Sequence, residues 1–276
     1  MCGTCGCSDG NKATIIDLQT GEHTHIDADG NEITHSHDHD HDHGHAHTHA
    51  GAHGTTIALE QAIMQKNDAL AARNRAWFNG REILALNLVS SPGSGKTSIL
   101  ERTIVDLKGK TPISVIEGDQ QTANDAQRIK DSGAPSVQIN TGTGCHLEAD
   151  MVMSGLKALK PSAGSIVMIE NVGNLVCPAL FDLGEAAKVA ILSVTEGEDK
   201  PIKYPHMFQA SDVMLLNKTD LLPHLDFDVD QCMEYARQVN PNIKIIQVSA
   251  KTGEGMDDWY SWLEQQCVQA REQAFA

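Results

Sequence analysis

One segment of the chain has residue types and spacing suited to binding phosphate groups. Residues 90–97 read SSPGSGKT, between a short apolar run and a helical pattern, although Ser90 stands in place of the usual first glycine. Glycines let backbone N–H groups point at phosphate oxygens, and the start of a helix adds its dipole. The lysine of such a loop reaches the β- and γ-phosphates, and the threonine binds Mg²⁺. The predicted phosphate-binding residues are Gly93, Ser94, Gly95, Lys96, Thr97 and Ser98, and Lys96 is also a predicted catalytic residue.

A second segment predicts which base is bound. Residues 217–220 read NKTD directly after an apolar run, and residues 249–251 read SAK after the last one. The carboxylate of Asp220 can accept hydrogen bonds from the N1–H and 2-amino groups of guanine, a donor pair that adenine lacks. With the wrong base, this buried carboxylate would lose its partners at high cost. The motifs predict a GTPase that binds GTP and GDP. The predicted base-binding residues are Asn217, Lys218, Asp220, Ser249, Ala250 and Lys251.

Two segments between these motifs are candidates for the parts of a GTPase that respond to the γ-phosphate. Asp119 follows the second apolar run, where a carboxylate can hold Mg²⁺ directly or through water, and Asp125 is the alternative. Glu170 and Gly173 follow the fourth run, where the glycine N–H can contact the γ-phosphate. Small GTPases usually have an aspartate at the position of Glu170. No glutamine is placed to orient the attacking water, so we expect slow hydrolysis, with Asp119 assisting catalysis.

Three cysteines at the start of the chain form the first candidate metal site. Cys2, Cys5 and Cys7 lie within six residues and next to a free α-amine. Thiolate and amine donors suit a square-planar Ni²⁺ or a tetrahedral Zn²⁺, and this spacing can wrap one ion without a fold. The alternative is a flexible tail with incidental thiols.

A histidine tract is the second candidate site. Imidazoles bind Ni²⁺ and Zn²⁺, and flexible ligands hold several ions weakly and exchange them quickly. This pattern favours a reservoir or a source for metal transfer, and a solvated linker is the alternative. The tract contains His35, His37, His39, His41, His43, His45, His47 and His49, with His23, His25 and His53 nearby.

The third candidate site lies within the nucleotide-binding part of the chain. Cys145 and His146 are adjacent, and Cys177 comes four residues after Gly173. All three follow predicted strands, so they should lie on the nucleotide side of the sheet. A Ni²⁺ or Zn²⁺ ion held there would be coupled to the nucleotide state. Buried small cysteines and a hydrogen-bonded histidine are the alternative.

The elements that position these residues alternate along the chain. Seven short, β-branched apolar runs occupy residues 83–89, 113–116, 137–139, 166–169, 189–194, 213–216 and 243–248. Helical patterns occupy residues 55–77, 97–107, 123–132, 147–159, 228–239 and 256–273. Strands buried on both sides and separated by helices indicate an α/β fold with a mostly parallel seven-stranded sheet. Ligands then bind at the carboxyl ends of the strands.

Composition divides the chain into two parts. The 276 residues carry a formal net charge of −16, and residues 1–54 hold nine acidic side chains, one basic side chain and 11 of the 14 histidines. With so few apolar residues, we predict a disordered metal-binding tail over 1–54 and a GTPase domain over 55–276. The acidic balance argues against nucleic-acid binding, and no apolar run is long enough for membrane insertion. Seven cysteines beside a large core favour reduced thiols in the cytoplasm.

These motifs resemble those of the HypB family of hydrogenase nickel-incorporation GTPases over essentially the whole chain. The core alone is similar to the urease accessory GTPases. The resemblance implies a GTP-dependent homodimer, with metal near the subunit interface, that works with the accessory protein HypA to deliver Ni²⁺ to the hydrogenase large subunit. The matching segments are residues 2–7, the histidine tract, and residues 90–97, 141–146, 170–177, 196–204 and 217–220.

Two alternative functions remain open from the sequence. One is a metal buffer or storage protein whose nucleotide fold is regulatory. The other is a delivery GTPase for another nickel enzyme, such as urease. The exposed apolar positions expected at 221–225 are a candidate dimer surface.

Overall fold

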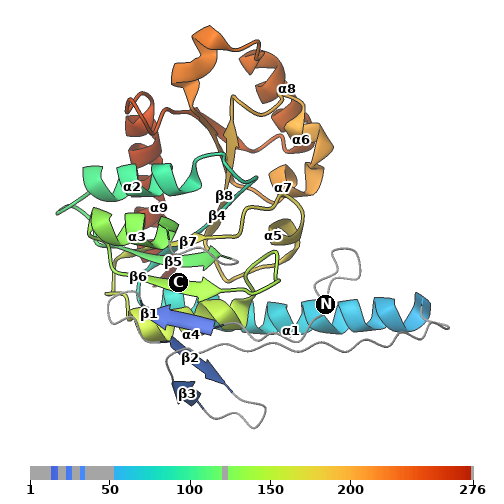
Figure 1. Ribbon diagram of the computed structural model, residues 1–276, viewed down its shortest axis with the longest axis vertical. Helices are drawn as coiled ribbons and strands as arrows, with labels where there is room; N and C mark the ends of the chain where they lie inside the picture. The colour runs from blue at the N-terminus through green and yellow to red at the C-terminus, as the bar shows by residue number, and fades with distance from the viewer. Residues whose placement is uncertain (1–13, 18–22, 27–31, 35–52, 120–123, 275–276) are drawn as a thin grey trace.

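The computed structural model has one sheet with helices on both of its faces (Figure 1). The structure describes residues 14–17, 23–26, 32–34, 53–119 and 124–274. Seven parallel strands lie in the order β10-β9-β8-β4-β7-β5-β6, which confirms the predicted α/β sheet. Every residue of β4, β7, β8 and β9 is buried, which explains their continuous apolar runs, whereas two of the four residues of the edge strand β10 are exposed. The strands are β4 (Leu84–Ser90), β5 (Ile113–Asp119), β6 (Ser136–Asn140), β7 (Ile166–Glu170), β8 (Ala187–Ser193), β9 (Val213–Asn217) and β10 (Lys244–Gln247).

The helices cover both faces of this sheet. One core cluster joins α2, α3 and α9 to one face, and two others join α1, α4, α7 and α8 to the opposite face. Short helices that begin with proline at the first or second position fill the loops after β7 and β8. The helices are α1 (His53–Asn79), α2 (Lys96–Asp106), α3 (Asn124–Ser132), α4 (Ala149–Leu159), α5 (Cys177–Leu180), α6 (Lys200–Lys203), α7 (Pro205–Gln209), η1 (Thr219–His224), α8 (Val229–Val239) and α9 (Met256–Ala274).

Three further short strands extend the sheet beyond β6. They are β1 (Thr14–Asp17), β2 (His23–Ile26) and β3 (Glu32–Thr34), and β1 pairs antiparallel with β6. These three short segments fall inside residues 1–54, the part of the chain for which the sequence predicts a tail. An open sheet edge offers main-chain N–H and C=O groups, so a strand can add to it with few apolar side chains. The cysteine motif at residues 2–7 and the histidines of 35–49 lie outside the described residues.

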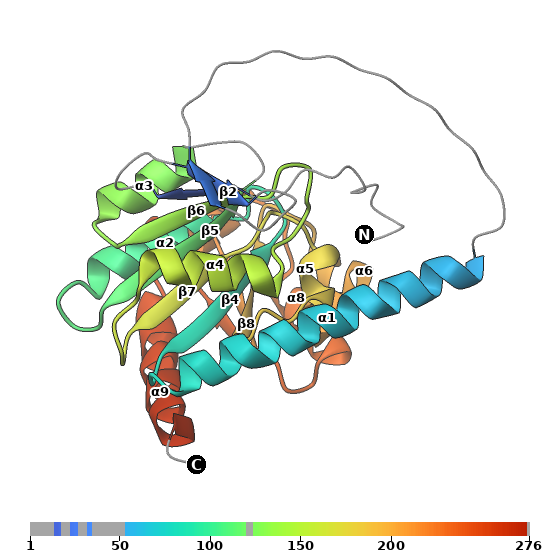
Figure 2. The ribbon, with the colours of Figure 1, turned by 90° about the horizontal axis from the view of Figure 1, so that it is seen from below.

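Helix α1 runs beside α4 and projects past the sheet (Figure 2). Its side chains hold two segments that flank the sheet. Asn67 accepts a hydrogen bond from Ala149 N at 2.9 Å and donates to Asp182 O at 2.7 Å. Asn74 donates to Ala149 O at 2.8 Å, and Arg75 pairs with Asp182 at 2.7 Å. The amino end of α4 and the loop before β8 are therefore fixed to one helix.

We predict that Gly184→Ala destabilises the fold by more than Gly164→Ala does. Both glycines have positive φ, 88° and 70°, so both changes carry the strain of a left-handed residue, roughly 1–2 kcal/mol. A Cβ at Gly184 would lie 2.5 Å from Ala71 O in α1, whereas nothing lies within 4 Å at Gly164. Displacing α1 should cost a further 1–3 kcal/mol or so. Urea unfolding of both variants measures the difference, and equal losses would contradict the contact with α1.

Candidate functional site

The phosphate-loop segment connects the end of β4 to the start of α2. Gly93 and Gly95 have φ of 77° and 99°, and α2 begins at Lys96, so the strand–loop–helix arrangement is as the sequence predicts. Only glycine adopts such angles readily, which explains both positions. The Lys96 ammonium donates to Ser90 Oγ at 2.8 Å. Ser90, the residue that departs from the usual loop pattern, therefore accepts a hydrogen bond from the loop's own lysine.

A cleft of about 490 Å³ lies between this loop and the ends of β5 and β7. Thr97 Oγ1 donates to Glu170 Oε1 at 2.8 Å, and Asp119 lines the same cleft at the end of β5. Glu117 also lines the cleft and pairs in register with Glu170, and both side chains are buried. Hydroxyl and carboxylate oxygens are the ligands that Mg²⁺ prefers. This donor set fits a magnesium ion, and Thr97, Asp119, Glu117 and Glu170 would hold it.

The base-binding segments lie against the phosphate loop. Asn217 is buried, its Nδ2 donates to Ser94 O at 3.0 Å, and its Oδ1 accepts from Ala250 N at 3.2 Å. Asp220 Oδ1 accepts from Ser249 Oγ at 2.6 Å. The Asn217 amide therefore ties the two segments of the base site to the phosphate loop. Lys218 adds a second tie, because its Nζ donates to a carbonyl of that loop at 2.7 Å. Lys251 and Ser98 lie at the rim of a neighbouring hollow.

The segment after β7 packs directly on the phosphate loop. A Cβ at Gly173 would lie 3.2 Å from Pro92 N and Cα, so this close approach favours glycine. Ser91 on the same loop donates to Glu196, whose other oxygen accepts from Ser193 N at 3.0 Å. The phosphate loop thus contacts the segment after β7, in which the sequence places a residue that responds to the γ-phosphate, and also the segment after β8.

The structure brings Cys145, His146 and Cys177 together beside the segment that follows β7. One ligand atom from each residue lies within 4.8 Å of the other two. Cys145 Sγ donates to Cys177 Sγ at 2.9 Å and lies 3.6 Å from His146 Nδ1. Two sulfur atoms and one imidazole nitrogen form a donor set for Ni²⁺ or Zn²⁺. The described part of the chain contains no other group of three such ligands.

His146 is held in a form suited to binding a metal. Its ring is buried and stacks on Phe181, with ring centroids 3.9 Å apart. Burial lowers the pKa of His146 to about 4. The imidazole is therefore neutral near pH 7 and keeps a lone pair for a metal ion.

Some residues of the cleft are not among the predicted site residues. Arg128 on α3 lines the cleft, and its guanidinium donates to Glu101 at 2.6 Å. Glu117 lies two residues before Asp119, so the alternation of a strand that ends at the cleft could have pointed to it. Arg128 carries no local signal, because only the packing of α3 on α2 places it there. Asp125, the alternative carboxylate, lies in the first turns of α3, where no side chain is described.

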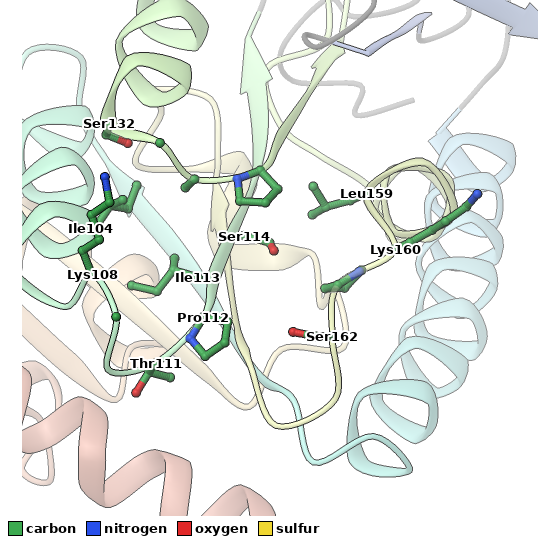
Figure 3. A pocket seen from close by; sticks show the side chains of 15 residues that line it. Ile104, Lys108, Thr111, Pro112, Ile113, Ser114, Ser132, Leu159, Lys160 and Ser162 are labelled. Carbon is green, nitrogen blue, oxygen red and sulfur yellow. The ribbon is translucent and has the colours of Figure 1, made fainter.

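A second hollow, of about 390 Å³, lies at the opposite edge of the sheet (Figure 3). It surrounds Ile113 at the start of β5, with Lys108 and Lys160 at its sides. The phosphate loop is at the other end of the strands, so this hollow takes no part in the nucleotide site. The described residues also include no helix that is long and apolar enough to cross a membrane.

Comparisons with known proteins agree with this geometry. Residues 84–247 match the family profile described as CobW/HypB/UreG, nucleotide-binding domain. The chain is 64% identical to the hydrogenase maturation factor HypB of Azotobacter vinelandii over 210 residues, covering 76% of this chain and 69% of that protein. It is 50% identical to that of Escherichia coli K12 over 291 residues, covering 96% and 99%.

A solved structure is also similar. The crystal structure of HypB from Helicobacter pylori in complex with nickel superposes with a TM-score of 0.69 and 39% sequence identity, covering 74% of this chain and 96% of that one. Because the profile spans more than half of the chain and the Escherichia coli relative nearly all of it, the chain belongs to the CobW/HypB/UreG family of nucleotide-binding proteins, among its HypB hydrogenase maturation factors.

Proposed function

We propose that the protein hydrolyses GTP and binds Ni²⁺ for delivery to nickel–iron hydrogenase during its maturation in the cytoplasm. The observation that carries the proposal is the position of Cys177. It follows the segment that packs on the phosphate loop at Gly173, and its sulfur lies 2.9 Å from that of Cys145. The nickel complex of the Helicobacter pylori relative supports nickel as the cargo.

The nucleotide half of the mechanism starts from Lys96. On binding GTP, Lys96 exchanges Ser90 Oγ for the β- and γ-phosphates, and the loop N–H groups surround them. A bound Mg²⁺ supplies positive charge to the phosphates. Thr97, Asp119 and Glu170 would hold this ion beside the phosphates. Asp220 selects guanine at the other end of the nucleotide. No glutamine is among the described residues that line the cleft, and we expect slow hydrolysis.

The metal half of the mechanism uses the cysteine and histidine ligands. Cys145 and Cys177 bind Ni²⁺ as thiolates, together with neutral His146, and Zn²⁺ can occupy the same set. GTP favours a homodimer, and hydrolysis relaxes the segment that carries Cys177, which releases the ion. The N-terminal cysteine and histidine ligands store Ni²⁺. The accessory protein HypA and the hydrogenase large subunit are the proposed partners.

We predict that Lys96→Ala lowers kcat for GTP hydrolysis at least about 100-fold, because the charge facing the transferred phosphate is lost. Lys108→Ala, at the opposite edge of the sheet, is the matched control and should keep wild-type activity. Phosphate release measures both. Hydrogenase activity in cells that carry Lys96→Ala should also fall. Intact hydrogenase maturation would favour a metal buffer instead.

We predict that Asp220→Asn exchanges guanine for xanthine nucleotides. The asparagine amide N–H can donate to the 2-oxo group of xanthine. With guanine, the same N–H would face the 2-amino group, so that two donors meet and no hydrogen bond forms. Affinity for GDP should fall at least about 100-fold and affinity for XDP should rise. Fluorescent nucleotide titration measures both, with exposed Asp226→Asn as the control. Unchanged affinity for GDP would show that Asp220 does not bind the base.

We predict that Cys177→Ser weakens Ni²⁺ binding in a full chain in which Cys2, Cys5 and Cys7 are serine. Removing a residue that hydrogen-bonds to a metal ligand typically lowers metal affinity about 10–100-fold. Removing the ligand itself should therefore lower the affinity at least as much. Cys267→Ser, in α9, is the control. Titration of the thiolate-to-nickel absorption band measures binding, and equal affinities would exclude Cys177 as a ligand.

A further inference from the structure

A chain of four buried polar side chains runs beneath the Cys145–Cys177 cluster. Its members are Asn171 after β7, Asn87 in β4, Glu185 before β8 and Lys188 in β8. Each is at least nine-tenths buried, with exposures of 1%, 0%, 9% and 7% in that order. Buried polar groups are costly unless they are paired. No motif for nucleotide or metal binding requires them at these positions.

One end of the chain lies beside the nucleotide cleft. Asn171 follows Glu170, which accepts the Thr97 hydroxyl hydrogen bond in the cleft. Asn171 Oδ1 accepts from Val172 N at 3.0 Å and from Leu147 N at 3.1 Å. Leu147 is the residue after His146. A single amide therefore joins the segment after β7 to the segment that carries two of the three metal ligands.

The middle of the chain crosses the sheet from β7 to β8 through β4. Asn171 Nδ2 donates to Asn87 Oδ1 at 3.2 Å, and Asn87 Nδ2 donates to Glu185 Oε1 at 3.0 Å. In each amide, the oxygen accepts hydrogen bonds from the side of the nucleotide cleft, and the nitrogen donates a hydrogen bond in the direction of Glu185. The direction of these hydrogen bonds fixes both side chains, because a reversed amide would face donor to donor or acceptor to acceptor.

The other end of the chain lies under Cys177. Lys188 Nζ is 3.7 Å from Glu185 Oε1, donates to Pro178 O at 2.9 Å and donates to Phe181 O at 3.4 Å. Pro178 is the residue after Cys177, and the Phe181 ring stacks on His146. The ammonium group thus holds the main chain of α5, whose first residue is Cys177.

We propose that Asn171, Asn87, Glu185 and Lys188 are positioning residues that couple the nucleotide state to the spacing of Cys145, His146 and Cys177. This inference rests on the proposed function. When the segment of Glu170 and Asn171 shifts with the γ-phosphate, the directional chain moves both ligand-bearing segments together. Asn67 and Arg75 on α1 fix these two segments at Ala149 and Asp182. The movement is therefore largest at the metal ligands, which lie away from these fixed points.

The test uses the full chain with Cys2, Cys5 and Cys7 replaced by serine, so that the N-terminal cysteines no longer contribute to the nickel–thiolate absorption of Cys145 and Cys177. NiCl₂ titrations with GDP and with a non-hydrolysable GTP analogue give a ratio of two dissociation constants. Couplings of this kind are typically about 5–150-fold. Asn171→Asp keeps the acceptor for the two N–H groups but removes the donor to Asn87. Lys188→Met removes the donors at the other end.

Both variants should bring the ratio close to one while each still binds nucleotide and nickel. Asn240→Ala is the matched control, because the Asn240 amide also holds main-chain groups, among them Phe208 O and Ser211 O, but lies outside this chain of four side chains. It should keep the parental ratio. Thermal melting of each variant reports folding. The two substitutions interrupt opposite ends of the hydrogen-bonded chain, so either folded variant alone tests the positioning role.

The outcomes separate this inference from the proposed function. A parental ratio of one would refute the nucleotide-coupled metal release itself. A parental ratio well above one that survives Asn171→Asp or Lys188→Met in a folded variant would overturn the positioning role. Loss of folding in both variants, with Asn240→Ala folded, would assign the four residues a purely structural role and would also overturn it.

Discussion

The parallel direction of the seven central strands is the constraint on which the whole site depends. Parallel strands end at one edge of a sheet, so loops that are far apart in the chain meet there. The phosphate loop follows β4, Asp119 and Glu170 end β5 and β7, and the base segments follow β9 and β10. An antiparallel strand among them would send its loop to the opposite edge. The hydrogen bonds of Asn217 to Ser94 and Ala250 show how close these loops come.

Charge is distributed unequally between the nucleotide cleft and the cluster of Cys145, His146 and Cys177, which lie side by side at the carboxyl edge of the sheet. The nucleotide cleft contains buried Glu117 and Glu170 and the ammonium of Lys96, so it favours a cation together with phosphates. The metal cluster beside it contains two thiols and a neutral imidazole, with His146 stacked on Phe181. Burial also raises the pKa of Glu148, which flanks the cluster. Sulfur and imidazole ligands favour a transition metal over Mg²⁺, so each half can hold its own ion.

The sequence predicts most of the fold because its signals are local. The seven strands are continuous apolar runs, and the phosphate loop and the NKxD segment follow strands directly. The pairing of Asn87 with Glu185 could not be predicted, because the two residues lie 98 positions apart and meet only when β4 and β8 are neighbours. A lone asparagine inside an apolar strand was the visible signal. The placement of Arg128 in the cleft likewise depends on tertiary packing alone.

The pairing of β1 with β6 bears on how the chain avoids self-association. Without β1, the edge of β6 would present a row of main-chain donors and acceptors to another molecule. A protein shortened to residues 55–276 would lose all three added strands. Such a fragment would be prone to edge-to-edge aggregation, and the resulting contacts could be mistaken for dimerisation driven by nucleotide. The N-terminal strands thus protect a sheet edge, in addition to any role of their neighbours in metal binding.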